Sequence, residues 1–129
     1  MPGISEDYIA YRVSKSTEIF EDAEILAEKN RWNSCVNRLY YSAYYMVSAL
    51  LSKHNMKATT HNGVKKEFFH HFVKPEKASK EYGKLFSTLF RWRQESDYAD
   101  FIDFDKETVQ PLISSVSDFN KAIQLLLEN

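Results

Sequence analysis

The run Asn33–Leu51, NSCVNRLYYSAYYMVSALL, is the most apolar and aromatic stretch of the chain. At about 100° per residue, its apolar side chains fall on one helical face: Val36, Leu39, Tyr40, Ala43, Val47, Leu50 and Leu51. The opposite face carries Arg38, Tyr41, Tyr45 and Ser52. Neither face of this helix has the polar composition of a solvent-exposed helix face. We therefore predict a central helix with packing partners on both sides, and we consider a second protomer or a ligand as one of them.

Length and composition indicate one helical domain, residues 1–129. The 3 glycines and 3 prolines leave little turn chemistry for an all-β protein. The net charge of −1 means that any affinity for nucleic acid must come from local patches. Cys35 is the single cysteine, which excludes an internal disulfide and fits a reducing cytosol.

No part of the sequence resembles a membrane or export segment. Residues 1–7 have neither a basic region nor an apolar core of a signal peptide. No run approaches the roughly 20 apolar residues that span a bilayer. We expect a soluble cytoplasmic protein without membrane contact.

Apolar spacing predicts an all-α, up-and-down bundle of four long helices and one shorter helix. The expected helices are Ser5–Lys29, Asn33–His54, His61–Val73, Ala78–Tyr98 and a last one from Asp105 or Thr108 to Leu127. Ser5, Asn33 and Thr60 are the expected N-caps of the first three helices. Pro111 is tolerated if Thr108 caps the last helix, and it kinks that helix if the start is earlier.

The segment Arg91–Tyr98, RWRQESDY, is the most suggestive one after the central helix. Arg93 continues the apolar stripe of its helix, so its guanidinium should be partly buried and should need an acceptor. One interpretation is two ordinary ion pairs four residues apart, Arg91 with Glu95 and Arg93 with Asp97. The other is a phosphate- or base-binding corner at the end of a helix.

The tyrosines of the central helix also allow two interpretations. Tyr40, Tyr41, Tyr44 and Tyr45 are typical of core and interface positions whose hydroxyls reach polar partners. They could instead form a stacking platform for bases, but within this helix only Arg38 supplies positive charge. A core or a dimer interface is the favoured interpretation.

The histidines do not predict a metal site. No pair has the spacing of a helical metal site with a neighbouring acid, and one cysteine cannot build a zinc site. We expect His61 to be a local cap or surface residue. The alternative is that His61 lines the same cleft as Arg93. We expect no cofactor.

Three stretches of the sequence together resemble one known family. The segment Asn37–Tyr45, NRLYYSAYY, followed by Ala49–Leu51, resembles the signature second helix of HEPN domains. Thr60–Val64 and Arg93–Tyr98 resemble two further segments of the same family. The match covers nearly the whole chain in order and spacing.

The resemblance implies a bundle of four to five helices that is often dimeric. It also implies pairing with a minimal nucleotidyltransferase in a toxin–antitoxin module. Many members of the family are metal-independent ribonucleases that use an arginine followed a few residues later by a histidine. In some modules the partner attaches AMP to a tyrosine shortly after that histidine.

This sequence departs from that pattern, because all its histidines precede Arg91. If Arg91 is the family's arginine, Ser96 stands where the histidine would be and Tyr98 where the modified tyrosine would be. If Arg93 is the arginine, Tyr98 takes the histidine's place. Serine has no group that titrates near neutral pH to act as a general acid or base. The family's ribonuclease chemistry is therefore not predicted for this chain.

The leading hypothesis is a non-catalytic HEPN domain that binds nucleotide or RNA as an accessory subunit. It would pair with itself and with a nucleotidyltransferase-like protein. The expected cleft residues are Arg38, Tyr41, Tyr45, Arg93, Asp97 and Tyr98, with His61, Arg91 and Ser96 as further candidates. Arg93 would contact phosphate, Asp97 would orient it, and Tyr98 would stack or be modified. The alternatives are a ribonuclease toxin using Arg91 or Arg93 with Tyr98 or His61, and a plain dimerisation module.

Overall fold

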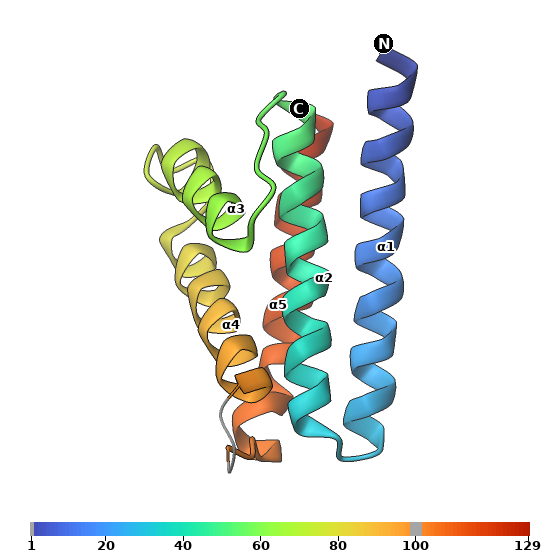
Figure 1. The fold of residues 1–129 in the computed structure, drawn as a ribbon, viewed down its shortest axis with the longest axis vertical. Helices are drawn as coiled ribbons and strands as arrows, with labels where there is room; N and C mark the ends of the chain where they lie inside the picture. The colour runs from blue at the N-terminus through green and yellow to red at the C-terminus, as the bar shows by residue number, and fades with distance from the viewer. Residues whose placement is uncertain (1, 99–101) are drawn as a thin grey trace.

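The computed structural model describes residues 2–98 and 102–129, with side chains for residues 6–97 and 102–129. In these ranges the elements are α1 (Pro2–Glu28), α2 (Trp32–Lys53), α3 (His61–Phe68), a π-helical turn (Phe69–Val73), α4 (Lys80–Tyr98) and α5 (Lys106–Glu128). The prediction of an all-α bundle of four long helices and a shorter one is confirmed (Figure 1).

Helix α2 lies at the centre of the bundle and contacts α1, α3, α4 and α5 (Figure 1). α1 and α2 run antiparallel, and α5 runs alongside α2 in the same direction. The apolar stripe of α2 accounts for this position, because Val36, Leu39 and Ala43 are fully buried. The predicted central helix is confirmed.

The core joins α2 to α3, α4 and α5 through aromatic side chains. Phe86 of α4 stacks on Phe119 of α5 with the ring centroids 6.0 Å apart. Phe68 of α3 meets Phe86 edge-on at 5.4 Å. Edge-to-face and offset-stacked pairs of this kind stabilise beyond their buried area. Tyr40 of α2 stacks on Phe86 with the ring centroids 6.0 Å apart, so these aromatic contacts hold α3 and α4 beside α2 and position the site described below.

Two helix starts are secured by side-chain caps. The Thr60 hydroxyl accepts from the Gly63 amide at 2.9 Å, and the Asp105 carboxylate accepts from the Thr108 amide at 2.9 Å. The predicted Thr60 cap is confirmed. Because Asp105 is the cap, Pro111 lies inside α5, where the Glu107 carbonyl has no amide to accept from.

The predicted Asn33 cap is wrong. Helix α2 begins at Trp32 after Arg31, which makes no side-chain capping bond. Asn33 instead holds the segment before α5 against α2. Its amide donates to the Ile102 carbonyl at 2.8 Å and accepts from the Phe104 amide at 2.8 Å. Both an N-cap and a long-range bond of this kind need a short polar side chain that bonds to backbone groups. The local sequence therefore does not tell the two roles apart.

Three other helix boundaries differ by more than one residue from those predicted. α1 extends to Pro2, so Ser5 is not its cap, since a proline in the first turn costs no helical hydrogen bond. The third helix ends as a π-helical turn, with the Lys74 amide bonded to the Phe69 carbonyl, because Pro75 offers no amide to continue an α-helix. α4 begins at Lys80, after Ser79 accepts from the Tyr82 amide.

Across the described residues, every helix is too short or too polar to cross a membrane.

Candidate functional site

Arg93 on α4 is a nearly buried cation, with 8% of its side chain exposed. The guanidinium carbon lies 5.0 Å from the centroid of the Tyr40 ring, which is a cation–π distance. Its only acid partner among the described residues is Asp97, at 3.8 Å, which is too long for a hydrogen bond. The buried Nε atom has no hydrogen-bond partner in the described part of the chain. The burial predicted for Arg93 is observed, and its acceptors are incomplete.

Tyr41 of α2 lies between two guanidinium groups. Its ring centroid is 5.2 Å from the Arg38 guanidinium carbon and 6.0 Å from that of Arg93. Arg38 is half-buried and donates through Nε and Nη2 to the Asn37 side-chain oxygen, at 3.1 and 2.7 Å. This fixes one edge of the Arg38 guanidinium, and the described residues provide no further hydrogen-bond partner for its other N–H groups. The structure therefore brings Arg38, Tyr41 and Arg93 together.

Asp97 of α4 is the last member of this group of side chains. It accepts from the Asn37 amide at 3.4 Å, so Asn37 links the carboxylate to Arg38. A pocket of about 380 Å³ opens here, lined by Leu26, Asn33, Ser34, Asn37, Arg38, Ser96 and Asp97. We call Asn37, Arg38, Tyr41, Arg93 and Asp97 the arginine cluster. Arg38 and Asp97 line this pocket, and Arg93 lies 3.8 Å from the Asp97 carboxylate without lining it.

His61, at the start of α3, lies next to the arginine cluster. Its Nδ1 is 2.7 Å from the hydroxyl of the buried Tyr40. Burial, with a smaller contribution from the positive charge of Arg93, lowers the pKa of His61 below its usual 6.5. Burial likewise raises the pKa of Tyr40, although the Arg93 charge opposes this. At neutral pH, Tyr40 is therefore protonated and His61 is neutral, so the hydroxyl can donate to Nδ1 and hold the ring in place.

The other predicted site residues are not members of the arginine cluster. Tyr45 faces α1, where the Arg12 guanidinium carbon is 5.7 Å from its ring centroid. Arg91 is exposed and lies 3.9 Å from Glu95. Ser96 lines the pocket, and its hydroxyl donates to the Arg93 carbonyl. The side chain of Tyr98 lies outside the described residues.

Sequence reasoning missed Tyr40 and Asn37 as site residues. Tyr40 was assigned to the apolar stripe, and it is indeed fully buried, but its hydroxyl reaches His61. A signal was present, since a tyrosine in a buried stripe needs a partner for its hydroxyl. Asn37 gave no comparable signal, because its neighbour Asp97 is 60 residues away in sequence.

Cys35 and the histidines of the described residues are not arranged as metal ligands, and the Cys35 thiol is buried. Cys35 is buried, and burial raises its pKa to about 11, so the thiolate form is scarce at neutral pH. Nowhere in the described ranges do three histidine, cysteine or acidic side chains gather as metal ligands would.

Comparison with known proteins identifies the family. The model of the HEPN domain matches residues 9–126. The chain belongs to the HEPN family. This HEPN domain is 36% identical over 124 residues to a Thermotoga maritima protein named "UPF0332 protein", covering 96% of this chain and 94% of that protein.

Two Methanocaldococcus jannaschii proteins are also similar to this HEPN domain. One, named "Putative toxin MJ0142", is 30% identical over 101 residues, which cover 78% of this chain and 69% of that protein. The other, named "Putative toxin MJ0605", is 32% identical over 76 residues, covering 59% of this chain and 57% of that protein. The resemblance seen in the sequence is thereby confirmed.

Proposed function

We propose that this HEPN domain binds the phosphates of RNA or of a nucleotide at the arginine cluster. We further propose that it serves as the accessory subunit of a toxin–antitoxin module, as a homodimer and beside a nucleotidyltransferase-like partner. The observation that carries the binding proposal is Arg93, a nearly buried cation with an unpartnered Nε and no carboxylate within hydrogen-bond distance among the described residues.

In this proposal the cluster residues have partly different roles from those in the sequence-based hypothesis. Arg38 is the more accessible cation and lines the pocket, so it would meet a phosphate first. Arg93 does not line the pocket but would attract the same phosphate through its charge, because it is nearly buried and water screens it weakly. Asp97 would hold Arg93 and Asn37 in place. Tyr41, between the two cations, would offer a ring to a base.

The binding test uses a short single-stranded RNA carrying a fluorophore, with AMP as competitor. A phosphate contact through a charged donor contributes about 1.5–3 kcal/mol, so Arg38→Gln should weaken RNA binding about tenfold or more. Arg93→Gln should weaken it as well. The matched control is Arg91→Gln, which removes an exposed cation from the same helix. If all three variants bind like the wild type, the cluster is not the phosphate site.

A ribonuclease is the second candidate, because the structure brings His61 within reach of Tyr40 and Arg93. In the tautomer whose Nδ1–H donates to the Tyr40 hydroxyl oxygen, Nε2 of His61 keeps its lone pair and is suited to act as a general base. The nearby Arg93 could stabilise a phosphorane-like charge. This arrangement supplies the histidine from α3 instead of from the residues after Arg91.

RNA cleavage in the presence of EDTA separates the two candidates. The accessory-subunit proposal expects RNA binding without cleavage. Metal-independent cleavage that disappears in His61→Ala and Arg93→Gln, but persists in His54→Ala, would establish the enzyme instead. Light scattering of the purified chain measures its mass, and a monomer at all concentrations would contradict the homodimer.

A further inference from the structure

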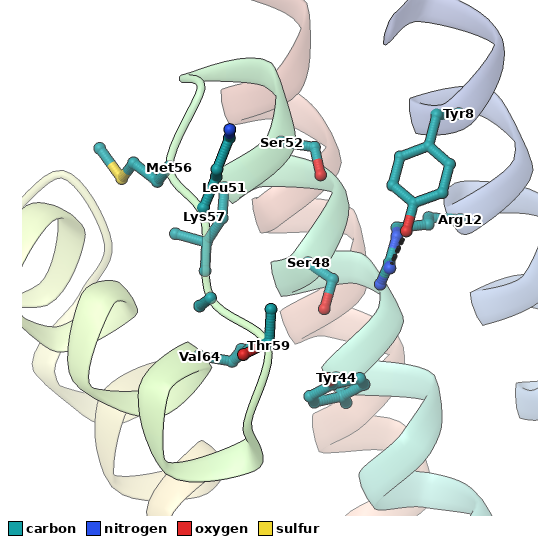
Figure 2. Close-up of a pocket in the computed structure, with 11 residues that line it drawn as sticks. Tyr8, Arg12, Tyr44, Ser48, Leu51, Ser52, Met56, Lys57, Thr59 and Val64 are labelled. Atoms are coloured by element: carbon teal, nitrogen blue, oxygen red, sulfur yellow. Dashed lines mark hydrogen bonds between the residues drawn. The ribbon is translucent and has the colours of Figure 1, made fainter. Parts of the chain in front are cut away.

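A second pocket, of about 420 Å³, lies between α1, α2 and the loop that leads into α3 (Figure 2). It is lined by Tyr8, Arg12, Tyr44, Ser48, Leu51, Ser52, Met56, Lys57, Ala58, Thr59 and Val64. None of the arginine cluster's side chains is among them. The volume falls within the range of small-molecule sites in proteins.

Arg12 of α1 is held at this pocket without being neutralised. Its Nη2 donates to the Tyr8 hydroxyl, and its guanidinium carbon lies 4.6 Å from the centroid of the Tyr8 ring. Its buried Nε has no hydrogen-bond partner among the described residues. The eleven described lining residues include no carboxylate, and Lys57 adds a second positive charge at the rim. The pocket therefore has an oriented cation and an excess of positive charge.

Ser48 of α2 is the second unpartnered polar group of the pocket. Only 6% of the residue is exposed, and its buried hydroxyl makes no hydrogen bond within the described part of the chain. Figure 2 shows this hydroxyl on the side of α2 that faces Arg12. A buried hydroxyl without a partner loses free energy relative to water, so a ligand that accepts from it would restore that loss.

The opposite wall of the pocket is apolar. It is formed by Leu51, Met56, Ala58 and Val64, from the end of α2, the loop and α3. Two more hydroxyl residues, Ser52 and Thr59, line the pocket. With Arg12 and Ser48 they provide more donors than the two oxygens of a carboxylate need, but they suit the three terminal oxygens of a phosphate monoester.

We propose that this pocket binds a small organic phosphate monoester, with the phosphate at Arg12 and Ser48 and the organic part against Leu51, Met56 and Val64. The site is separate from the arginine cluster and is independent of the function proposed above. The guanidinium and hydroxyl supply the charge and the hydrogen bonds, and the apolar wall selects for an organic group over free phosphate.

Calorimetric titration of the full chain with phenyl phosphate tests this proposal. Phenyl phosphate should bind more tightly than inorganic phosphate, which lacks the apolar part, than phenol, which lacks the charge, and than benzoate, which has fewer oxygens. Arg12→Gln should weaken binding of phenyl phosphate at least about tenfold, the usual effect of removing a charged donor. Lys15→Gln, which removes a cation of α1 that does not line the pocket, should leave it unchanged.

Ser48→Ala is a second variant that tests binding separately from folding, in case Arg12→Gln also destabilises the protein. Because the Ser48 hydroxyl has no partner in the described structure, its removal should leave the thermal midpoint of unfolding unchanged while weakening phenyl phosphate binding severalfold. The proposal is overturned if the wild type binds no phenyl phosphate, or if both variants bind it as the wild type does. Loss of binding in Arg38→Gln but not in Arg12→Gln would place the ligand at the arginine cluster and would equally overturn it.

Discussion

Arg93 and Arg12 approach α2 from two sides, and both place a guanidinium against its tyrosines. Arg93 lies 5.0 Å from the Tyr40 ring centroid, and Arg12 lies 5.7 Å from that of Tyr45. In both residues the buried Nε has no partner among the described residues. They differ in what surrounds them. Arg93 is packed between α2 and α4 beside Asp97, whereas Arg12 lines an open pocket whose described residues include no carboxylate.

We infer from this difference that the two arginines have different roles. A packed arginine contributes its aliphatic stem to the core and acts on neighbouring titratable groups, as Arg93 does on His61. An arginine at an open pocket, such as Arg12, contributes little to the core, and the donors that do not bond to Tyr8 remain for a ligand.

Truncation of the two arginines should affect stability very differently. Arg93→Ala removes a nearly buried side chain from between Tyr40 and Phe90, and the lost packing should lower the free energy of unfolding by about 2 kcal/mol or more. Arg12→Ala should lower it by less than about 1 kcal/mol, because its pocket is open to water. Urea unfolding followed by circular dichroism measures both.

The exposed Arg91 is the control for this comparison. Arg91→Ala removes the same atoms from the same helix, but its pair with Glu95 is solvated and should contribute little. Equal losses in the Arg93 and Arg12 variants would contradict the division between a packed and an open arginine.

Ser42 and Ser48 of α2 provide the same comparison for uncharged side chains, one hydrogen-bonded and one without a partner among the described residues. Ser42 and Ser16 bond reciprocally to each other's carbonyls, at 2.8 and 2.6 Å, and Asn120 donates to the Ser42 hydroxyl at 2.9 Å. Ser42→Ala should therefore destabilise the protein by about 1–3 kcal/mol, because it leaves buried groups of α1 and α5 unpaired. Ser48→Ala should have no measurable cost, since its hydroxyl is unpaired in the described structure.

Thermal unfolding of the two variants provides the measurement, and both substitutions remove one oxygen from a buried position of one helix. Similar midpoints for Ser42→Ala and Ser48→Ala would show that the α1–α2–α5 hydrogen bonds do not hold the bundle together. A large loss for Ser48→Ala would show that its hydroxyl already has a partner, and the pocket would lose one of its two unpartnered groups.

The bundle could be predicted from sequence because helical periodicity and core burial agree along most of the chain. The apolar stripe of α2 is buried as predicted. The failures were local choices that distant residues decide. Asn33 has the chemistry of a cap, but its partners are 69 and 71 residues away, which no local pattern specifies.

The sites were less predictable for the same reason. Arg93 could be identified because a charge on an apolar stripe signals a buried cation. Arg12 carried a similar signal, since it lies four residues before the buried Ser16 on α1, but the polar composition of that helix obscured it. The contact between Tyr40 and His61 depends on how α3 folds back onto α2, which the sequence of either helix alone does not determine.

The smallest predicted effect concerns the protonation of His61. Its pKa in the folded protein lies below the usual 6.5, so above pH 6.5 it is neutral in both the folded and unfolded states and does not affect stability. As the pH falls through 6.5, the unfolded chain binds a proton first. His61 should therefore cause stability to decrease as the pH falls from 6.5 towards the folded-state pKa.

The two arginines should act differently on that pKa. Arg93→Gln removes a positive charge near His61, so the pKa should rise. It should remain below 6.5, because burial is the larger cause of the lowering and the ring stays against Tyr40 and Tyr44. Arg12→Gln should leave the pKa unchanged, since Arg12 is not among the causes of its shift. Proton NMR titration of the His61 ring measures all three proteins. An unchanged pKa in Arg93→Gln would show that water screens this charge as it would at the surface, and Arg93 would then no longer count as a packed charge that acts on its neighbours.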